Sequence, residues 1–596
     1  MAHDTIPMRL VERAQRSPDE PAYFVKDKGM WQGTSWSGYA AEVRRAAKSL
    51  LALGVETSEC VALIGGNRPE WSTLMIGAMS IGACGAGLYT TSSELETQAI
   101  LAHAEARLVL VDSAAALERV RSLKPTLPAL RRIIVVGLPV HGDPLALTWS
   151  EFLERGNGVP DARLRERLGA LTADSIASLV YTSGAEGSSQ GVLLSHRNLT
   201  WTSDVVSDLL HIGASDTSLS YLPLAHVSEQ LFTVHGPVAT GSGVYYSEST
   251  RSAPSNLREV QPTVVFGVPR IWEKLQAGME ARLSGVHGPR KRLVAWARTI
   301  ATRVIEARNE GKEPSLELAA QYELAHSLVL TKIKRALGLG AARICISGAA
   351  PIDAATLTFF ASIGLQLLEV YGQTESSGPI AMNQPRRTRF GSAGPRLPGL
   401  RVSIAPDGEL LVAGPNVFAG YHRDPEASAR ALAGGFLHTG DLARIDAEGF
   451  LSITGRKRQI LVTAGGKNVS PKRLEAALRG EELIREAVVI GDRRRYLSAL
   501  VTIDEEVAER LGLRDSLHEN SIVRERVARH IEALNARLGS AEQLRRHLIL
   551  PRNFRIETGE LTPTMKLRRH RIEELWSKEI EALYAETPEQ SSQRSQ

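Results

Sequence analysis

A glycine-rich loop between two apolar runs is the feature that most constrains this sequence. It lies within residues 179–198, which read LVYTSGAEGSSQGVLLSHRN. Glycine lacks a Cβ atom, so backbone N–H groups at Gly184, Gly187 and Gly191 are able to approach an anion, and the neighbouring serines add donors. The apolar run before the loop predicts a buried strand, and a helix is expected from about Ser195. This stretch therefore predicts a phosphate-binding loop at the edge of a buried sheet.

The rest of the chain alternates helical patterns with short apolar runs. Alternation of this kind predicts an α/β fold with a parallel sheet covered by helices. Helical patterns occupy residues 40–53 and 93–104, and the apolar runs are residues 60–64, 108–111, 133–136, 264–266 and 344–346. Residues 293–339 form a long basic region with helical spacing, for which we expect an amphipathic helix pair, with a membrane-surface face as the alternative.

The last third of the chain has a different residue pattern. Residues 391–455 contain short apolar runs separated by Gly, Pro and Asp, which predict a small β-barrel. A mixed section of about 130 residues follows, the size of a small domain. The last ten residues are polar, and we expect them to be disordered. A length of 596 residues is too great for a single core, so two or more domains are expected.

Composition excludes several functional classes. Apolar residues make up 43% of the chain and charged residues 23%, as in a soluble globular protein. The three cysteines are far apart, which argues against a zinc site or a disulfide framework. The N-terminus lacks the apolar core of a signal peptide, so a cytoplasmic location is expected. The net charge of +5 suits an acidic small molecule, but no basic stripe predicts nucleic-acid binding. Residues 71–93 are uncharged, and we interpret them as a buried helix and strand rather than a membrane span.

Several later motifs carry a resemblance to a known family. They are SGAAP (347–351), EVYGQTE (369–375), LHTGD (437–441) and GELTPTMK (559–566). With the glycine-rich loop, they resemble the acyl-adenylating (AMP-binding) superfamily. Residues 261–274, QPTVVFGVPRIWEK, resemble the acyl-tunnel segment of long-chain fatty-acid–CoA ligases, similar to the bubblegum-type acyl-CoA synthetases. A chance match of EVYGQTE with SGAAP about twenty residues upstream is improbable.

The resemblance implies a nucleotide site and names its residues. The Tyr371 ring would stack on adenine, the Thr374 hydroxyl would meet the α-phosphate, and Glu375 would hold Mg²⁺. Asp441 would accept both ribose hydroxyls, supported by Arg456. The full set implied for ATP and AMP is Thr182, Ser183, Gly184, Gly187, Gly348, Ala349, Glu369, Val370, Tyr371, Gly372, Gln373, Thr374, Asp441, Arg456 and Lys566.

The resemblance also implies the catalytic and the CoA-binding residues. Lys566 would bridge carboxylate and phosphate, and a cation there offsets charge as one anion attacks another. His226, in YLPLAH, would lie near the acyl carboxylate, so the implied catalytic residues are Lys566, Thr374, Glu375 and His226. Arg458 falls on the hinge, where the family usually has Asp or Lys. The CoA thiol channel would be lined by Gly465, Gly466 and Lys467.

The resemblance implies an architecture and an activity. Residues 1–455 would form an AMP-binding domain of two α/β subdomains plus a β-barrel, residues 456–586 a mobile α+β lid domain, and residues 587–596 a tail. The activity would be ATP- and Mg²⁺-dependent conversion of a medium to very long chain fatty acid, through acyl-AMP, to acyl-CoA. The partners expected are the fatty acid, ATP and CoA, with peripheral contact at the inner face of a membrane left open.

The loop itself departs from the family pattern, Tyr-Thr-Ser-Gly-Thr-Thr-Gly-x-Pro-Lys-Gly-Val. The two threonines are Ala185 and Glu186, the proline is Ser189, and the lysine is Gln190. A carboxylate beside a triphosphate is repulsive, and an amide supplies no cation. Two alternatives therefore stay open: a fatty acyl-AMP ligase that delivers to a carrier protein, and a catalytically impaired ligand-binding relative.

Overall fold

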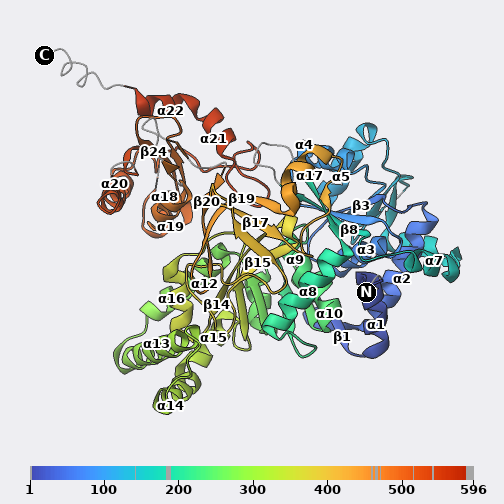
Figure 1. Ribbon diagram of the computed structural model, residues 1–596, viewed down its shortest axis with the longest axis horizontal. Helices are drawn as coiled ribbons and strands as arrows, with labels where there is room; N and C mark the ends of the chain where they lie inside the picture. The colour runs from blue at the N-terminus through green and yellow to red at the C-terminus, as the bar shows by residue number, and fades with distance from the viewer. Residues whose placement is uncertain are drawn as a thin grey trace.

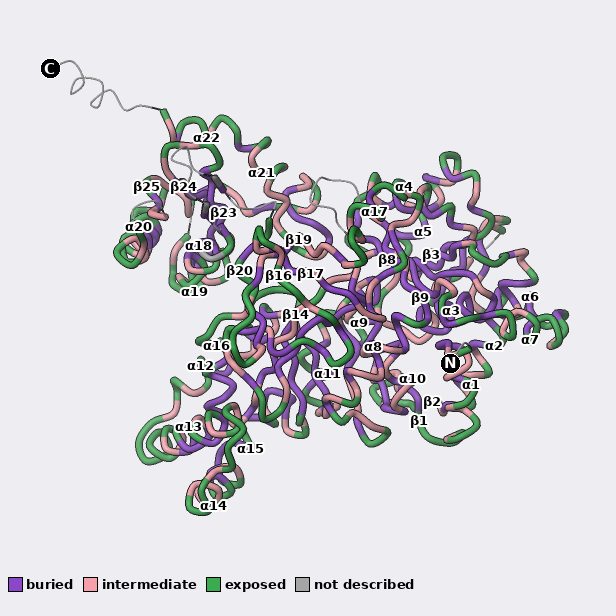
Figure 2. The backbone as a smooth tube through the Cα atoms, in the orientation of Figure 1, coloured by how far each residue is buried: buried purple, intermediate pink, exposed green. Residues whose placement is uncertain are grey.

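The computed structural model describes residues 3–140, 142–182, 190–457, 461–462, 468–469, 471–514, 516–539 and 542–585. A large N-terminal part, drawn in blue to orange in Figure 1, carries a smaller C-terminal part drawn in red at the upper left. Buried backbone runs through the centre of both parts, and exposed backbone covers their outer helices (Figure 2). The chain therefore has the expected α/β class, with a large first unit and a small second unit.

The first sheet has eight strands and contains the strand before the glycine-rich loop. Its strand order is β18-β9-β8-β4-β3-β5-β6-β7, and its central strands are parallel. Helix α3 (Pro69–Ser80) is buried, so the uncharged stretch is a buried helix followed by a buried strand, as predicted. The strands are β3 (Cys60–Ile64), β4 (Cys84–Leu88), β5 (Leu108–Val111), β6 (Arg132–Val135), β7 (Ala146–Thr148), β8 (Ile176–Thr182), β9 (Gln190–Ser195) and β18 (Gly420–Tyr421).

The chain around the glycine-rich loop differs from the expected strand, loop and helix. Strand β9 pairs antiparallel with β8, so the loop joins two strands of a hairpin. Helix α8 (His196–Leu210) begins one strand later, with Ser195 and Asn198 in a reciprocal capping box. The apolar residues 192–194 are responsible, because they are buried or half-buried in the sheet rather than opening a helix. The N-terminus of α8 therefore lies one strand away from the loop.

A second eight-stranded sheet forms the other half of the large part. Its order is β15-β14-β13-β12-β10-β11-β1-β2, and its inner strands pair in parallel. The two strands predicted after the loop are β12 and β13. The strands are β1 (Pro21–Asp27), β2 (Met30–Ser35), β10 (Thr217–Ser220), β11 (Gly243–Tyr246), β12 (Val264–Gly267), β13 (Ile344–Ser347), β14 (Leu367–Gln373) and β15 (Gly378–Met382).

The smaller sheets follow in the chain. Where a small β-barrel was expected over residues 391–455, the strands form an antiparallel four-stranded sheet whose end strands are not paired with each other. Its strands are β16 (Arg401–Ile404), β17 (Glu409–Ala413), β19 (Leu437–Ile445) and β20 (Leu451–Arg456). The C-terminal part has a sheet of β23 (Ile484–Ile490), β24 (Leu497–Ile503) and β25 (Leu544–Ile549), and a short pair, β21 (Leu461–Val462) with β22 (Asn468–Val469). Its own apolar clusters on the two faces of the three-stranded sheet give it a separate core.

The helices cover the sheets and form one projecting arm. Instead of the helix pair expected over residues 293–339, three helices, α13, α14 and α15, with the π-helical turn 326–330 between α14 and α15, form this arm at the lower left of Figure 1. No helix within the described residues is both long enough and apolar enough to cross a membrane. The helices of the large part are α1 (Ile6–Arg16), α2 (Trp36–Ala52), α4 (Glu94–His103), α5 (Ala114–Leu123), α6 (Trp149–Arg155), α7 (Asp161–Gly169), α9 (Val227–Gln230), α10 (Gly236–Thr240), α11 (Ala253–Val260), α12 (Pro269–Ser284), α13 (Gly288–Asn309), α14 (Leu316–Ala325), α15 (Thr331–Leu337), α16 (Ala354–Ser362) and α17 (Pro425–Ala431).

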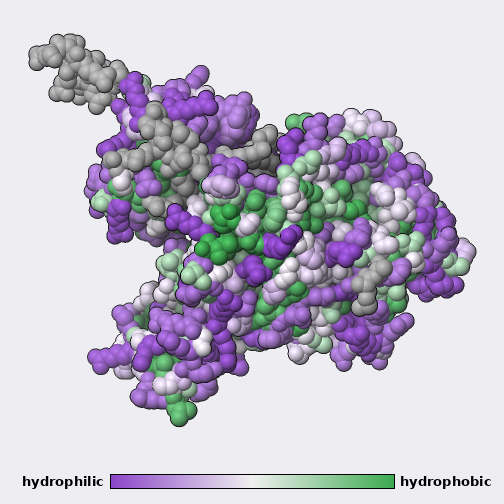
Figure 3. Space-filling model, viewed as in Figure 1, coloured by the Kyte–Doolittle hydropathy of each residue, from purple (hydrophilic) through white to green (hydrophobic). Residues whose placement is uncertain are grey.

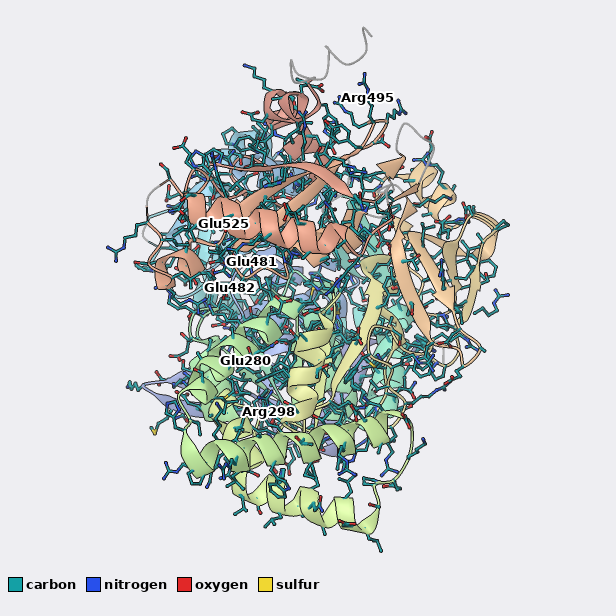
Figure 4. All side chains as sticks on the ribbon, turned by 90° about the vertical axis from the view of Figure 1, so that its left-hand side faces the viewer. Glu280, Arg298, Glu481, Glu482, Arg495 and Glu525 are labelled. Atoms are coloured by element: carbon teal, nitrogen blue, oxygen red, sulfur yellow. The ribbon has the colours of Figure 1, made fainter. Side chains whose placement is uncertain are left out.

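The C-terminal part lies over the arm side of the large part. In the side view of Figure 4, the labelled Glu481, Glu482 and Glu525 of the C-terminal part lie above Glu280 and Arg298 of the large part. The helices here are α18 (Pro471–Leu478), α19 (Glu505–Arg510), α20 (Ser521–Asn535), α21 (Arg569–Leu575) and α22 (Ser577–Tyr584).

Candidate active site

A cavity of about 1360 Å³ lies where the two parts meet. Its walls come from the ends of β8 and β14, from β19 and β20, and from the C-terminal residues Lys472, Ala476 and Lys566. Its lining includes charged groups and also apolar side chains, among them Leu231, Phe232 and Phe266, which we call the apolar region. This cavity has room for a ligand with a polar and an apolar end.

Asp441 is held by two donors at the cavity wall. Its carboxylate accepts a hydrogen bond from the Tyr371 hydroxyl (2.7 Å) and one from Arg456 Nε (3.0 Å). Tyr371 lies on β14 of the second eight-stranded sheet, whereas Asp441 and Arg456 are paired directly between β19 and β20 of the four-stranded sheet. Asp441 is only 4% exposed, and charge-assisted hydrogen bonds satisfy its buried charge. The carboxylate is therefore fixed in orientation beside the Tyr371 ring.

Two glycines allow the backbone to pack closely behind this site. A Cβ atom at Gly372 would lie 1.8 Å from the Gly378 carbonyl oxygen, on the strand paired with β14. A Cβ atom at Gly348 would lie 2.6 Å from Val370 Cγ1. Side chains at these positions would push β14 outward, so the glycines set the position of Tyr371.

Glu375 follows β14 and is surrounded by protein. Burial raises the pKa of its carboxyl, while a hydrogen bond from the Tyr421 hydroxyl to Oε1 (3.0 Å) partly opposes this. Tyr421 lies on β18, which pairs with β9, so this contact joins the end of the second sheet to the first. A buried carboxylate with a raised pKa gains stability when a cation approaches it.

Lys566 projects into the cavity from a tight turn of the C-terminal part. The Thr562 N–H donates to the Lys566 carbonyl (2.8 Å), and the Lys566 N–H donates to Thr562 Oγ1 (3.0 Å). Burial, and next the charge of Arg456, lower the pKa of Lys566. The turn is docked on the large part by Thr91 Oγ1, which donates to the Pro563 carbonyl (3.1 Å). The lysine is therefore held against the site by contacts between the two parts.

A second contact docks the same turn. Arg568 lies 3.5 Å from the Glu96 carboxylate of α4, and both side chains are partly buried. Together with the Thr91 hydrogen bond, it fixes the C-terminal part in the arrangement that brings Lys566 to the cavity.

His226 is the N-cap residue of α9 and lines the cavity. Its Nδ1 accepts the Ser228 N–H (3.2 Å), which places the proton of the neutral ring on Nε2. Burial, with a smaller effect from the Lys566 charge, lowers its pKa to about 4. The ring is therefore neutral near pH 7, and Nε2–H is a donor.

The apolar region ends at a π-helical turn, residues 231–235. Phe232 stacks on Phe266 with ring centroids 5.2 Å apart. Leu231 and Phe232 also border a second cavity of about 20 Å³ on their other side. These two residues therefore contribute to the lining of both cavities.

Most of the nucleotide-site residues named from the sequence lie together. Gly348 does not line the cavity but packs behind Val370. Seven named residues, Ser183, Gly184, Gly187, Arg458, Gly465, Gly466 and Lys467, lie outside the described residues. The named residues that line the cavity are Thr182, His226, Ala349, Glu369, Val370, Tyr371, Gly372, Gln373, Thr374, Glu375, Asp441, Arg456 and Lys566.

Sequence reasoning missed other groups at the cavity. Tyr421 and Lys472 were not named, and neither stands in a motif that points to this site. Glu409 was also missed: it accepts the Gly440 N–H (2.9 Å) and pairs with Lys457 (3.0 Å), which ties the turn before Asp441 to the end of β20. Only the folded arrangement brings these residues together.

The fold and the cavity define a two-part α/β protein with a ligand site at the junction of its parts. Residues 10–422 match the family model described as AMP-binding enzyme, and residues 458–588 match the model described as AMP-binding enzyme C-terminal domain. The chain therefore belongs to the AMP-binding enzyme family.

Similar proteins are known across nearly the whole length. The long-chain-fatty-acid–CoA ligase ACSBG2 of Homo sapiens is 32% identical over 617 residues, covering 97% of this chain and 92% of the relative. The long-chain-fatty-acid–CoA ligase FadD15 of Mycobacterium tuberculosis is 34% identical, with 98% and 97% covered. In fold, the chain is similar to the A domain of a carboxylic acid reductase from Segniliparus rugosus solved with AMP and a carboxylic acid, with a TM-score of 0.74, 20% identity and coverage of 97% and 94%.

Proposed function

We propose that this protein is a fatty-acid–CoA ligase that activates a medium to very long chain fatty acid through acyl-AMP. One observation carries the proposal: a single cavity joins the Asp441, Glu375 and Lys566 charges to an apolar region. Relatives that match over nearly the full chain are named long-chain-fatty-acid–CoA ligases, which supports the same activity.

In the first half-reaction, a carboxylate oxygen of the fatty acid attacks the α-phosphorus of ATP. A new O–P bond forms, the bond to the β-phosphate oxygen breaks, and pyrophosphate leaves. Lys566 offsets the negative charge as the two anions approach, and Thr374 donates to the α-phosphate. Asp441 accepts the ribose hydroxyls while Tyr371 stacks on adenine. His226 Nε2–H orients the carboxylate at the mouth of the apolar region.

Glu375 fits a divalent cation. Among the described residues, no cluster of three or more His, Cys, Asp or Glu side chains is placed to hold a metal ion. Mg²⁺ characteristically uses one or two carboxylates together with substrate phosphates and water, and the partly buried Glu375 supplies such a carboxylate. When bound, the ion neutralises phosphate charge.

In the second half-reaction, the CoA thiol loses its proton and its sulfur attacks the acyl carbonyl carbon. A C–S bond forms, the bond from that carbon to the phosphate oxygen breaks, and AMP leaves. The C-terminal part, residues 456–586 in our domain division, would turn about Arg458 relative to residues 1–455. Gly465, Gly466 and Lys467 would then line the thiol channel. The same cavity serves transfer to a carrier protein if the protein stops at acyl-AMP, which is the second candidate function.

The altered loop favours a third candidate, a ligand-binding relative without activity. Mass spectrometry of acyl-AMP and acyl-CoA, formed from ATP and a panel of fatty acids, separates the three. The ligase forms both products, a carrier-dependent enzyme forms acyl-AMP alone, and an impaired relative forms neither.

Lys566→Ala gives a sharper test of the site. It should abolish acyl-AMP formation but leave thioester formation from supplied acyl-AMP largely intact, because the lysine acts on the attacking carboxylate and the α-phosphate. Equal loss in both half-reactions would contradict this role.

The helical arm supports peripheral contact with a membrane. Leu316, Leu324 and Leu328 are 92%, 53% and 45% exposed, and they are spaced by eight and four residues along the arm. Figure 3 shows apolar surface at the tip of this arm. Exposed basic residues 290–292 at the start of α13 would favour an anionic lipid surface.

A further inference from the structure

Lys472 is a second lysine of the C-terminal part that enters the cavity. It lies in the first turn of α18, and Ala476, one turn later on the same face of the helix, also lines the cavity. Its side chain is accessible within this space although protein surrounds it. The sequence motifs give it no role.

Lys472 makes no hydrogen bond or ion pair with any described residue. The nearby carboxylates are already engaged: Glu475 accepts the Val489 N–H (2.9 Å) and pairs with Arg569, and Asp441 is held by Tyr371 and Arg456. Lys472 therefore lies near other positive charges without an ion pair to any described carboxylate, and an anionic ligand would offset the repulsion from Arg456 and Lys566.

The charges around Lys472 also point to an anion. Burial, followed by the charge of Arg456, lowers the pKa of Lys472 to about 8, and Lys566 contributes in the same direction. In the sequence, residues 183–191 contain no lysine or arginine and include one glutamate. Of the other cations that line the cavity, Arg430 and Arg444 belong to the large part, whereas Lys472 and Lys566 belong to the C-terminal part.

We propose that Lys472 contacts the phosphates of ATP and supplies positive charge that the glycine-rich loop lacks. This inference rests on the proposed nucleotide site but goes beyond it, since it assigns phosphate binding to a second lysine of the C-terminal part. The first turn of α18 adds a favourable dipole on the same side.

Calorimetric binding of MgATP to the full-length protein, without fatty acid, tests the inference. Lys472→Gln should raise the dissociation constant about tenfold, because a hydrogen bond to a charged group is lost. Lys472→Arg should retain most of the affinity, since the positive charge remains. Lys578→Gln, on the exposed surface of α22, is the matched control and should bind as the unmodified protein does. CoA affinity should not change in any variant.

Proton uptake gives an independent readout. At pH 8 about half of the Lys472 side chains are uncharged, so phosphate binding should take up a fraction of a proton, measured in two buffers of different ionisation enthalpy. The uptake should fall in Lys472→Arg. Circular dichroism melting checks that each variant is folded.

Three results would overturn the inference: MgATP affinity of Lys472→Gln within twofold of the unmodified protein, equal loss in Lys472→Arg, or equal loss in Lys578→Gln. If the unmodified protein binds MgATP but forms no acyl-AMP, the proposed activity fails while the Lys472 assignment is still decided by binding. If it binds no MgATP, both fail.

Discussion

The contacts that dock the Lys566 turn allow a quantitative prediction. Thr91→Val removes the hydrogen bond to the Pro563 carbonyl, and Arg568→Gln removes the ion pair with Glu96. A neutral hydrogen bond contributes about 1 kcal/mol and a partly exposed ion pair about 0.5 kcal/mol. The double variant should therefore destabilise the docked arrangement of the C-terminal part, relative to the undocked one, by about 1.5 kcal/mol. This changes their equilibrium constant by a factor of about ten.

The two half-reactions separate this effect from general damage. Acyl-AMP formation needs Lys566 at the cavity, so its kcat/KM should fall up to about tenfold. Thioester formation from supplied acyl-AMP should not fall, because the C-terminal part would leave this arrangement for that step. Arg197→Gln is the control. It breaks an exposed ion pair (2.7 Å) between Arg197 of α8 and Asp174, and it should change neither half-reaction. Equal loss in both half-reactions with unchanged melting temperature would refute the reasoning.

Two further predictions concern acid stability and the helical arm. Burial lowers the pKa of His196, His226 and His235 to about 3, 4 and 3, so the unfolded chain binds more protons below pH 6.5 and stability falls as the pH falls. Each histidine should lower the free energy of unfolding by about 2 kcal/mol between pH 7 and pH 5, as measured by urea unfolding. His235→Leu should reduce that loss. An unchanged dependence of the unfolding free energy on pH in this variant would contradict the prediction. Replacing Leu316, Leu324 and Leu328 together by glutamine should lower cosedimentation of the protein with anionic phospholipid vesicles. The control Leu575→Gln, on α21, should not lower it. If the unmodified protein does not bind the vesicles, the proposed membrane contact is wrong.

The fold was predictable where a local run of apolar residues indicates a buried strand. Apolar runs such as residues 60–64 and 108–111 became central parallel strands, because strands covered on both faces are apolar throughout. The strand after the glycine-rich loop was missed. Residues 192–194 are equally compatible with a strand or a helix start, and their pairing with β8 and β18 is a long-range effect.

The site was predictable to the extent that motifs are contiguous. The EVYGQTE motif predicted the site residues at the end of β14, and the LHTGD and GELTPTMK motifs predicted Asp441 and Lys566. Tyr421 could not be found in this way, because its contact with Glu375 depends on β18 reaching the first sheet. Lys472 depends on how the C-terminal part docks, and no local pattern encodes that geometry.

The division of charge between the two parts has a consequence for product release. Lys472 and Lys566 belong to the C-terminal part, whereas Glu375 and Asp441 belong to the large part. Any movement that withdraws the C-terminal part takes two positive charges away from the cavity and leaves the carboxylates behind. Pyrophosphate would then face a more negative wall and be driven out. The same motion that opens the cavity would make return of pyrophosphate unfavourable, because the two lysines that attract it would have moved away.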